Sequence, residues 1–218
     1  MTESVNARAA ILAEIRGNRP LPAADSIAQN YEAIPRAYVR SDFLSSQERV
    51  NLFESRLREY DANVYRAALK SLPEVIDHVL ALRKKTRIGV PHGLPANWLL
   101  NLRLFVTGCD THSPQELDKL EGVLTSCTVA IAVTGTIVLQ HDTAHGPRKL
   151  SLVPDYHLCI VFAGQLVGTV PEAFDRLAPT ATVPTTFISG PSATADIEMT
   201  RIKGVHGPRF LDVIVVVD

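Results

Sequence analysis

The chain has 218 residues, 22 basic and 23 acidic side chains, and a formal net charge of -1. Its composition, 46% hydrophobic and 21% charged, is that of an ordinary globular protein of one or two domains rather than a disordered chain. The balanced charge argues against nucleic-acid binding, for which a basic excess is the usual footprint. It leaves room for a small anion-binding pocket, because one Arg and a few backbone N–H groups suffice for that.

The longest apolar runs, around Val129–Leu139 and Val213–Val217, fall short of the ~20 residues that a membrane span needs. The first residues lack the basic segment and apolar core of a secretory signal. Cys109, Cys127 and Cys159 form no CxxC pair, so their spacing favours neither zinc or iron–sulfur ligation nor a disulfide scaffold. We therefore expect a cytoplasmic protein with no metal or cofactor of its own.

Capping residues place the expected helices. Residues 4–16 are predicted to form a helix that ends at Gly17, and the Pro- and Ala-rich stretch Asn18–Asp25 to form an irregular connector. Further helices are expected over about 46–60 and 72–84. Expected helix starts with Ser or Thr at the N-cap and Glu three residues later, the capping-box pattern, lie at Ser45, Ser71, Ser113 and Thr169.

Short apolar runs of strand length alternate with these helices. Two of them, VAIAV at 129–133 and DVIVVV at 212–217, are apolar on both faces, which is typical of central parallel strands covered by helices. A tight turn at Thr134-Gly135 predicts one antiparallel hairpin. The predicted strands are Arg87–Val90, Leu104–Thr107, Val129–Val133, Thr136–Gln140, His157–Ala163, Thr185–Ser189 and Phe210–Val217.

This alternation predicts a three-layer α/β fold with a mostly parallel central sheet flanked by helices. We expect residues 1–44 to be an N-terminal helical appendage and residues 45–218 to be the α/β domain. The common phosphate and nucleophile motifs GxGxxG, GxxxxGK[ST] and GxSxG are missing from the sequence. The candidate binding and catalytic residues are therefore expected in loops at strand ends, where open α/β sheets bind ligands.

The first candidate loop is Thr134-Gly135-Thr136. Its Gly allows a close approach to a ligand, and the hydroxyls of Thr134 and Thr136 are suited to bonding an anion. The alternative is a plain hairpin turn.

The second candidate loop runs from Ser189 to Glu198. A short helix is expected to begin after a Gly-Pro turn and to reach Lys203, so that its N-terminus offers an anion site. Asp196 and Glu198 are candidate acid/base residues, although their i,i+2 spacing puts them on different faces of a helix. The alternative is simply a well-capped helix. The candidate ligand-binding residues here are Ser189, Gly190, Ser192 and Thr194.

Two further segments complete the candidate site. His206 lies between Gly204 and Gly207 and is the side chain suited to proton transfer near neutral pH, although a lone loop His is more often only solvated. Arg209 is suited to clamping a carboxylate or phosphate. Arg148 and Ser151 precede another buried strand, and these loops make one pocket if they meet at one edge of the sheet.

Three other residues invite a functional reading. His141 and His145 have the i,i+4 spacing of a metal pair on a helix, but Gly146-Pro147 follows, so a polar surface loop is favoured. Trp98 is expected to be a packing residue rather than a stacking platform.

Four motifs occur in order: TGTIVL from Thr134, the segment Arg148–His157, the segment Ser189–Glu198, and GVHGP from Gly204. The set resembles the lactate-utilisation protein C family, whose members carry the LUD domain. The resemblance spans residues 45–217 and is clearest over 125–217. It implies a fold like that of the sugar-phosphate isomerase and CoA-transferase superfamily, with the N-terminal helices as an appendage.

The resemblance also implies a role in oxidising L-lactate to pyruvate alongside two iron–sulfur partner proteins, which agrees with the lack of cysteine clusters here. One position departs from the family, which often has Glu where this chain has Val133. By analogy with CoA-transferases that carboxylate is the candidate for covalent or acid/base work, and Val133 is incapable of either.

Three functional hypotheses follow. The first is a subunit of a lactate-oxidising system that binds a small anionic ligand and docks iron–sulfur partners. The second is an independent enzyme acting on a CoA ester, folate or sugar phosphate, with His206, Asp196 and Glu198 as acid and bases and Arg209 as the clamp. The third is a scaffold whose loops have a conformational role only.

Overall fold

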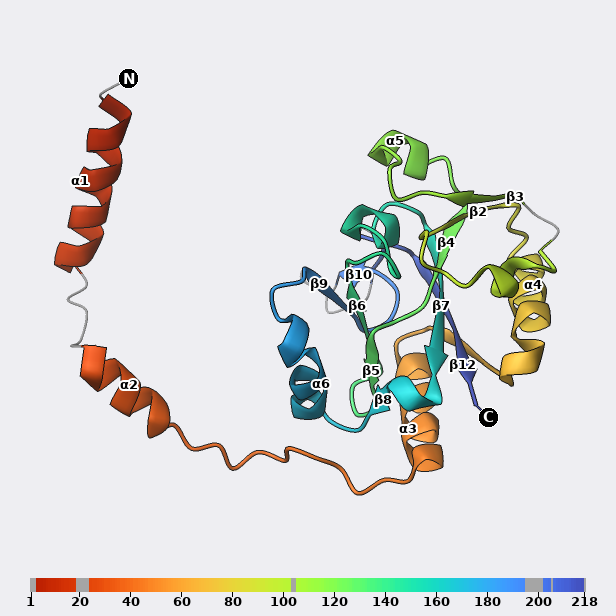
Figure 1. Ribbon diagram of the computed structural model, residues 1–218, viewed down its shortest axis with the longest axis horizontal. Coiled ribbons are helices and arrows are strands. Elements are labelled where there is room, and N and C mark those ends of the chain that lie inside the picture. The colour runs from red at the N-terminus through yellow and green to blue at the C-terminus, as the bar shows by residue number, and fades with distance from the viewer. Residues whose placement is uncertain (1–2, 19–23, 103–104, 195–201, 205, 218) are drawn as a thin grey trace. The chain divides into compact units, whose positions relative to one another are not determined.

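The computed structural model describes residues 3–18, 24–102, 105–194, 202–204 and 206–217. The chain divides into two compact units, Met1–Tyr38 and Val39–Asp218. The first unit contains α1 (Glu3–Asn18) and α2 (Ala24–Glu32), drawn in red and orange in Figure 1. The predicted N-terminal helix is confirmed, but Gly17 lies inside it, and α2 begins within the stretch that was expected to be irregular.

The second unit is built on a six-stranded sheet in the order β1-β12-β7-β4-β2-β3. Every neighbouring pair in it is parallel, so the predicted parallel sheet is confirmed. The last strand of the chain, β12, lies between β1 and β7, which explains why its run is apolar on both faces. The strand bounds are β1 Asn63–Ala67, β2 Arg87–Val90, β3 Phe105–Gly108, β4 Gly122–Thr125, β7 Tyr156–Phe162 and β12 Phe210–Val216.

A second sheet of four strands has the order β8-β5-β6-β9. The predicted hairpin is confirmed, because β5 and β6 are antiparallel and joined through Gly135 at φ +59°. The prediction that the run at 129–133 is a central parallel strand is only partly right, because β5 is an interior strand of this second sheet and is parallel to β8 but antiparallel to β6. Its burial on both faces comes from the first sheet on one side and α6 on the other. The bounds are β5 Val129–Ile131, β6 Thr136–Gln140, β8 Leu166–Val167 and β9 Thr185–Ile188.

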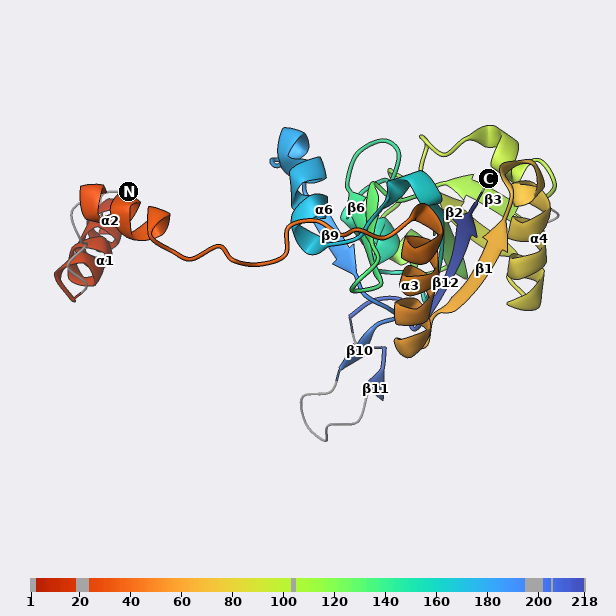
Figure 2. The same cartoon turned by 90° about the horizontal axis from the view of Figure 1, so that it is seen from below.

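The predicted helix leading to Lys203 is wrong at both of its described ends, and residues 195–201 between them lie outside the described residues. Ala193–Thr194 (β10) and Ile202–Lys203 (β11) form an antiparallel pair instead, with Ala193 opposite Lys203 (Figure 2). A Ser/Thr-rich segment after a Gly-Pro turn suits a strand as well as a helix start, so the local pattern did not distinguish the two.

The helices of the second unit are α3 (Ser46–Glu59), α4 (Leu72–Leu82), α5 (Pro114–Leu117) and α6 (Val170–Leu177). The predicted capping boxes form at Ser45, Ser113 and Thr169. The box at Ser71 does not, because its hydroxyl donates to the carbonyl oxygen of Ala68 in a preceding 3-10 turn. Within the described ranges, no helix is both long and apolar enough to span a membrane. Short 3-10 segments cover Leu69–Ser71, Ala96–Leu99, Arg148–Ser151, Ala163–Gln165 and Ala178–Thr180.

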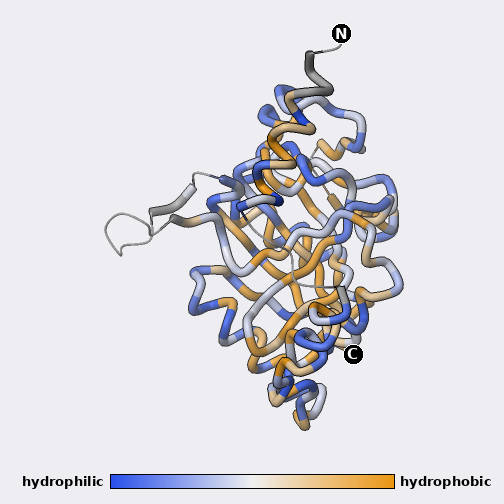
Figure 3. Tube along the Cα trace, turned by 90° about the vertical axis from the view of Figure 1, so that its left-hand side faces the viewer, coloured by the Kyte–Doolittle hydropathy of each residue, from blue (hydrophilic) through white to orange (hydrophobic). Residues whose placement is uncertain are grey.

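The central sheet is covered on both faces, as β12 shows. Leu211, Val213 and Val215 face a core shared with α3 and the second sheet, whereas Ile214 and Val216 pack toward α4. Burial of each such side chain stabilises the fold by about 1.5–3 kcal/mol. Figure 3 shows hydrophobic residues along these interior strands. The predicted α/β architecture with helices flanking a mostly parallel sheet is therefore confirmed.

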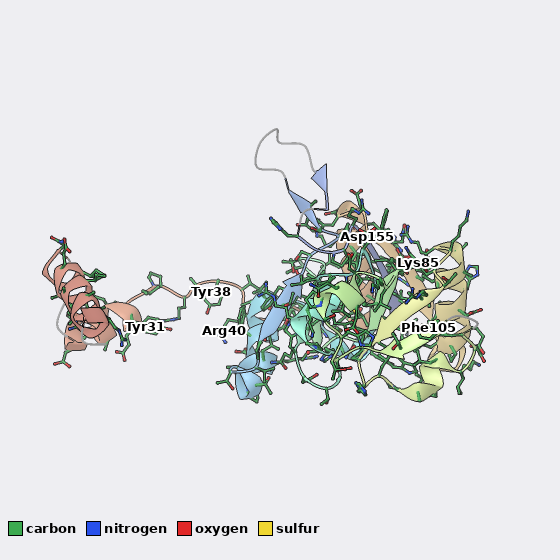
Figure 4. All side chains as sticks on the ribbon, turned by 90° about the horizontal axis from the view of Figure 1, so that it is seen from above. Tyr31, Tyr38, Arg40, Lys85, Phe105 and Asp155 are labelled. Carbon is green, nitrogen blue, oxygen red and sulfur yellow. The ribbon has the colours of Figure 1, made fainter. Side chains whose placement is uncertain are left out.

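The chain enters the second unit along α6. Arg40, labelled in Figure 4, has its guanidinium 3.1 Å from the carboxylate of Asp175, and its carbonyl oxygen accepts from the Thr169 hydroxyl. Asp42 pairs with Arg49 of α3 at 2.8 Å, which holds the pKa of the Asp42 carboxyl below its usual range. Residues 40–42 are thereby attached to the α/β unit.

Candidate functional site

A pocket of about 250 Å³ lies where the amino ends of β7 and β12 approach the end of β9. We call it the amino-edge pocket. Its apolar wall includes Leu152, Phe187, Pro208 and Leu211. It opens at the opposite edge from the carboxyl ends at which α/β sheets usually bind ligands. Its polar lining residues are Ser151, His157, Thr186, Ser189, Ser192 and His206.

The structure brings three of the four candidate segments to this pocket, and Ser192 joins two of them. Its N–H donates to the carbonyl oxygen of Pro208 at 2.8 Å, and its own carbonyl oxygen accepts from the Gly204 N–H at 3.0 Å. Its hydroxyl accepts from the His206 N–H at 3.3 Å. The loops that precede β10 and β12 therefore act as one wall.

Gly190 fixes the turn at the end of β9. Its φ is +87°, and a Cβ at this position would lie 2.5 Å from the Cβ of Tyr60. Both observations require Gly here, because a side chain is strained in this conformation and the space is occupied. Gly190 and Gly207 both line the pocket through their backbone.

The Thr134-Gly135-Thr136 loop does not line the pocket. It packs on α3, where a Cβ on Gly135 would lie 2.7 Å from the Cβ of Arg56. The loop reaches the pocket only through hydroxyls. The oxygens of Thr134 and Thr136 are 2.7 Å apart, and that of Thr136 is 2.7 Å from the hydroxyl of Ser189. Val133, beside this turn, is 45% exposed.

The predicted cations lie outside the lining. Arg209 binds Asp155, with Nη2 and Oδ2 2.9 Å apart, and this pairing lowers the pKa of the Asp155 carboxyl. Lys85 lowers it further, and Figure 4 shows Lys85 and Asp155 on the same side of the unit. Arg148 is exposed, while Ser151 of the same 3-10 segment faces the pocket. Among the described lining residues, none is Arg or Lys.

Of the three candidate acid/base residues, only His206 belongs to the described part of the chain. Asp196 and Glu198 lie outside the described residues, and Thr194 is described only as part of β10. His206 lines the pocket with an exposed side chain.

His157 lines the pocket, although the sequence analysis named it only as the end of the segment Arg148–His157 and not as a candidate site residue. It is the second residue of β7 and only 1% exposed, and burial lowers its pKa to about 4. Its Nε2 lies 2.8 Å from the hydroxyl of Thr125 on β4. The imidazole is therefore neutral at pH 7. A His within an otherwise apolar strand run was the available signal.

His141 and His145 lie in a loop, as expected, but they are not free surface groups. Nδ1 of His145, which is buried, lies 2.9 Å from both the Gln140 carbonyl oxygen and the Asp142 carboxylate. Nε2 of His141 lies 2.7 Å from the hydroxyl of Thr186, and burial lowers the pKa of this imidazole. Across the described ranges, no three His, Cys, Asp or Glu side chains are grouped to hold a metal ion.

The fold and sequence together define the class. The chain belongs to the LUD domain family, which matches residues 50–216. It is 43% identical over 187 residues to lactate utilization protein C of Deinococcus radiodurans, covering 85% of this chain and 87% of that protein. It is 29% identical to lactate utilization protein C of Halalkalibacterium halodurans, covering 80% and 81%. The crystal structure of a DUF162 family protein from Deinococcus radiodurans superposes with a TM-score of 0.67 and 37% identity, covering 80% of this chain and 99% of that one.

Proposed function

We propose that this protein is a component of a lactate-utilisation system and supports the oxidation of L-lactate to pyruvate. The observation that carries the proposal is the 43% identity to a lactate utilization protein C over most of both chains. The match of the LUD domain to residues 50–216 supports it, since that segment contains the whole amino-edge pocket.

We further propose that iron–sulfur centres of this system reside on partner proteins. All three cysteines of this chain are buried and free. Burial raises the pKa of the Cys109 thiol to about 12, which disfavours the thiolate that ligates metals. The donor set of the described residues therefore does not fit a cluster, and the role of this chain is to bind a small ligand and dock to such partners.

The pocket supports a small acid as the ligand. A volume of about 250 Å³ lies just below the range of about 300–1,000 Å³ found for pockets of drug-sized ligands, and it suits a small molecule. It disfavours the alternative of a CoA ester, folate or sugar phosphate, which are larger or need the phosphate-binding cations that the described lining lacks. A carboxylate would be held by the hydroxyls of Ser189 and Ser192 and by nearby backbone N–H groups.

The proposal is tested by purifying the full-length chain under anaerobic conditions from cells growing on lactate. We expect iron–sulfur proteins to co-purify, and lactate oxidation to require them. A thermal-shift panel of lactate, pyruvate, CoA and sugar phosphates tests the ligand, which at 100 times its dissociation constant adds about 2.7 kcal/mol of stability. Substrate turnover by the isolated chain would overturn the subunit role in favour of an independent enzyme.

A further inference from the structure

His157 has one satisfied and one unsatisfied ring nitrogen. Nε2 is paired with the Thr125 hydroxyl at 2.8 Å, while Nδ1 has no hydrogen-bond partner among the described residues. In the same part of the chain, the only fully occluded side-chain nitrogen or oxygen without a partner is Nε of Arg56. Nδ1 is therefore not sealed in the core. Because His157 lines the amino-edge pocket and its Nε2 is bonded to Thr125, we infer that Nδ1 is the ring nitrogen that faces the pocket.

The Thr125 hydroxyl determines which ring nitrogen carries the proton. If Nε2 carried it, Thr125 would accept that bond and its own proton would have only the sulfur of Cys159, 3.9 Å away and a weak acceptor. If Nε2 is bare, Thr125 donates to it at 2.8 Å and both groups are satisfied. Buried polar groups are almost always paired, so the second arrangement is favoured and the proton lies on Nδ1.

We propose that His157 binds the ligand of the amino-edge pocket by donating a hydrogen bond from Nδ1 to a carbonyl or carboxylate oxygen, so that the pocket favours a small 2-oxo acid. This inference rests on the proposed function for the identity of the system, and it assigns the ligand class and the residue that recognises it. A 2-oxo acid presents only acceptors, which matches a fixed N–H donor and adaptable serine hydroxyls. A 2-hydroxy acid offers the same carboxylate but replaces the carbonyl acceptor with a hydroxyl, whose own O–H also needs an acceptor.

Histidine NMR of the free, full-length protein tests the tautomer. With nitrogen-15-labelled histidine, we expect the His157 resonances of a neutral ring protonated at Nδ1. The Thr125→Val variant removes the donor to Nε2 and should move the proton to Nε2 or mix the two forms. A wild-type ring protonated at Nε2 would overturn the inference without any reference to ligand.

Calorimetric titration with pyruvate and L-lactate tests the contact. We expect wild type to bind pyruvate more tightly than lactate, and His157→Leu to weaken pyruvate binding by about tenfold or more, the effect of losing a hydrogen bond of about 1.5 kcal/mol. His157→Asn, whose amide N–H can stand near Nδ1, should recover most of the loss. Unchanged pyruvate affinity in a folded His157→Leu variant, or no pyruvate binding by wild type, contradicts the inference.

The experiments that test the role of His157 are distinct from those that test the proposed function. Co-purification with iron–sulfur proteins and lactate oxidation by the assembled system decide that function. The tautomer and the ratio of pyruvate affinities between His157→Leu and His157→Asn decide the role of His157. Lactate oxidation that requires this chain, together with equal affinities in both variants, would keep the function and remove the inference.

Discussion

The amino ends of β7 and β12 carry two buried polar groups on opposite faces, and they are built differently. On the α4 face, Asp212 is fully buried and accepts bonds from Arg83 at 2.8 Å, from Asn63 at 2.9 Å and from the Tyr156 hydroxyl at 3.1 Å. On the other face, His157 has a single partner and an open nitrogen. A buried group with every bond satisfied holds strands together, whereas one with a spare bond is available to a ligand.

Removing Asp212 should therefore have the largest effect on folding. Asp212→Ala leaves the Arg83 guanidinium without its carboxylate and should lower the free energy of unfolding by about 3–5 kcal/mol, measured by chemical denaturation. The matched control is Asp175→Ala, which removes an exposed pair with Arg40 and should cost less than about 1 kcal/mol. Equal losses of stability in the two variants would show that the hydrogen bonds of Asp212 contribute no more to stability than an exposed ion pair does.

The neutral imidazole of His157 should make the stability of the protein depend on pH. Burial lowers its pKa from 6.5 to about 4, so between these values the unfolded chain binds a proton that the folded chain does not. Stability should therefore decline as pH falls through that window, by up to about 3 kcal/mol at 1.36 kcal/mol per pH unit. The His157→Leu variant should lose this slope above pH 5, where most carboxylates stay ionised. The same slope in both proteins would show that His157 is not held neutral.

A substitution at Gly190 tests whether the backbone conformation of this turn is required for stability. Gly190→Ala places a Cβ at a positive φ and against Tyr60, and should cost about 2 kcal/mol of stability. Gly164→Ala is the control, since a Cβ at Gly164 has nothing within 4 Å, and its effect should stay within about 0.5 kcal/mol. A Gly190→Ala variant as stable as wild type would mean that the turn is not fixed by its backbone.

Arg209 should show the smallest effect. Its ion pair with Asp155 is solvent-exposed, and neither residue lines the pocket, so Arg209→Ala should leave the denaturation midpoint and the pyruvate affinity close to wild type. Titration calorimetry checks the affinity. A large loss of pyruvate affinity would instead restore Arg209 as the anion clamp that its loop position suggested.

The sequence allowed much of the fold to be predicted where local chemistry decides the outcome. The apolar run of β12, the turn at Thr134-Gly135 and the capping boxes are short-range signals, and all of them except the box at Ser71 form as expected. The edge strand β1 was missed because Asn63–Ala67 contains Asn and Arg and lacks an apolar run. The strand β4 was also missed, since Gly122–Thr125 has only two apolar residues, Val123 and Leu124, between a Gly and a Thr.

The candidate site was predicted less completely, because its geometry depends on distant parts of the chain. Ser189, Ser192 and His206 do meet in one pocket, as strand-end loops were expected to do. The pairing of Arg209 with Asp155 joins residues 54 positions apart, and no local pattern predicts it. The place of His157 in the pocket lining depends on how the two sheets pack, which no local pattern in the sequence predicts.

The hydroxyl chain of Thr134, Thr136 and Ser189 gives the pocket a polarity that extends beyond its walls. Each hydroxyl has one proton to donate, and either oxygen of each pair is free to be the donor. An occupant that accepts the Ser189 proton leaves Thr136 to donate to Ser189 and Thr134 to donate to Thr136, whereas an occupant that donates to Ser189 allows the opposite order. An acceptor in the pocket therefore determines the orientation of hydroxyl protons at the turn next to Val133, a part of the chain that does not line the pocket.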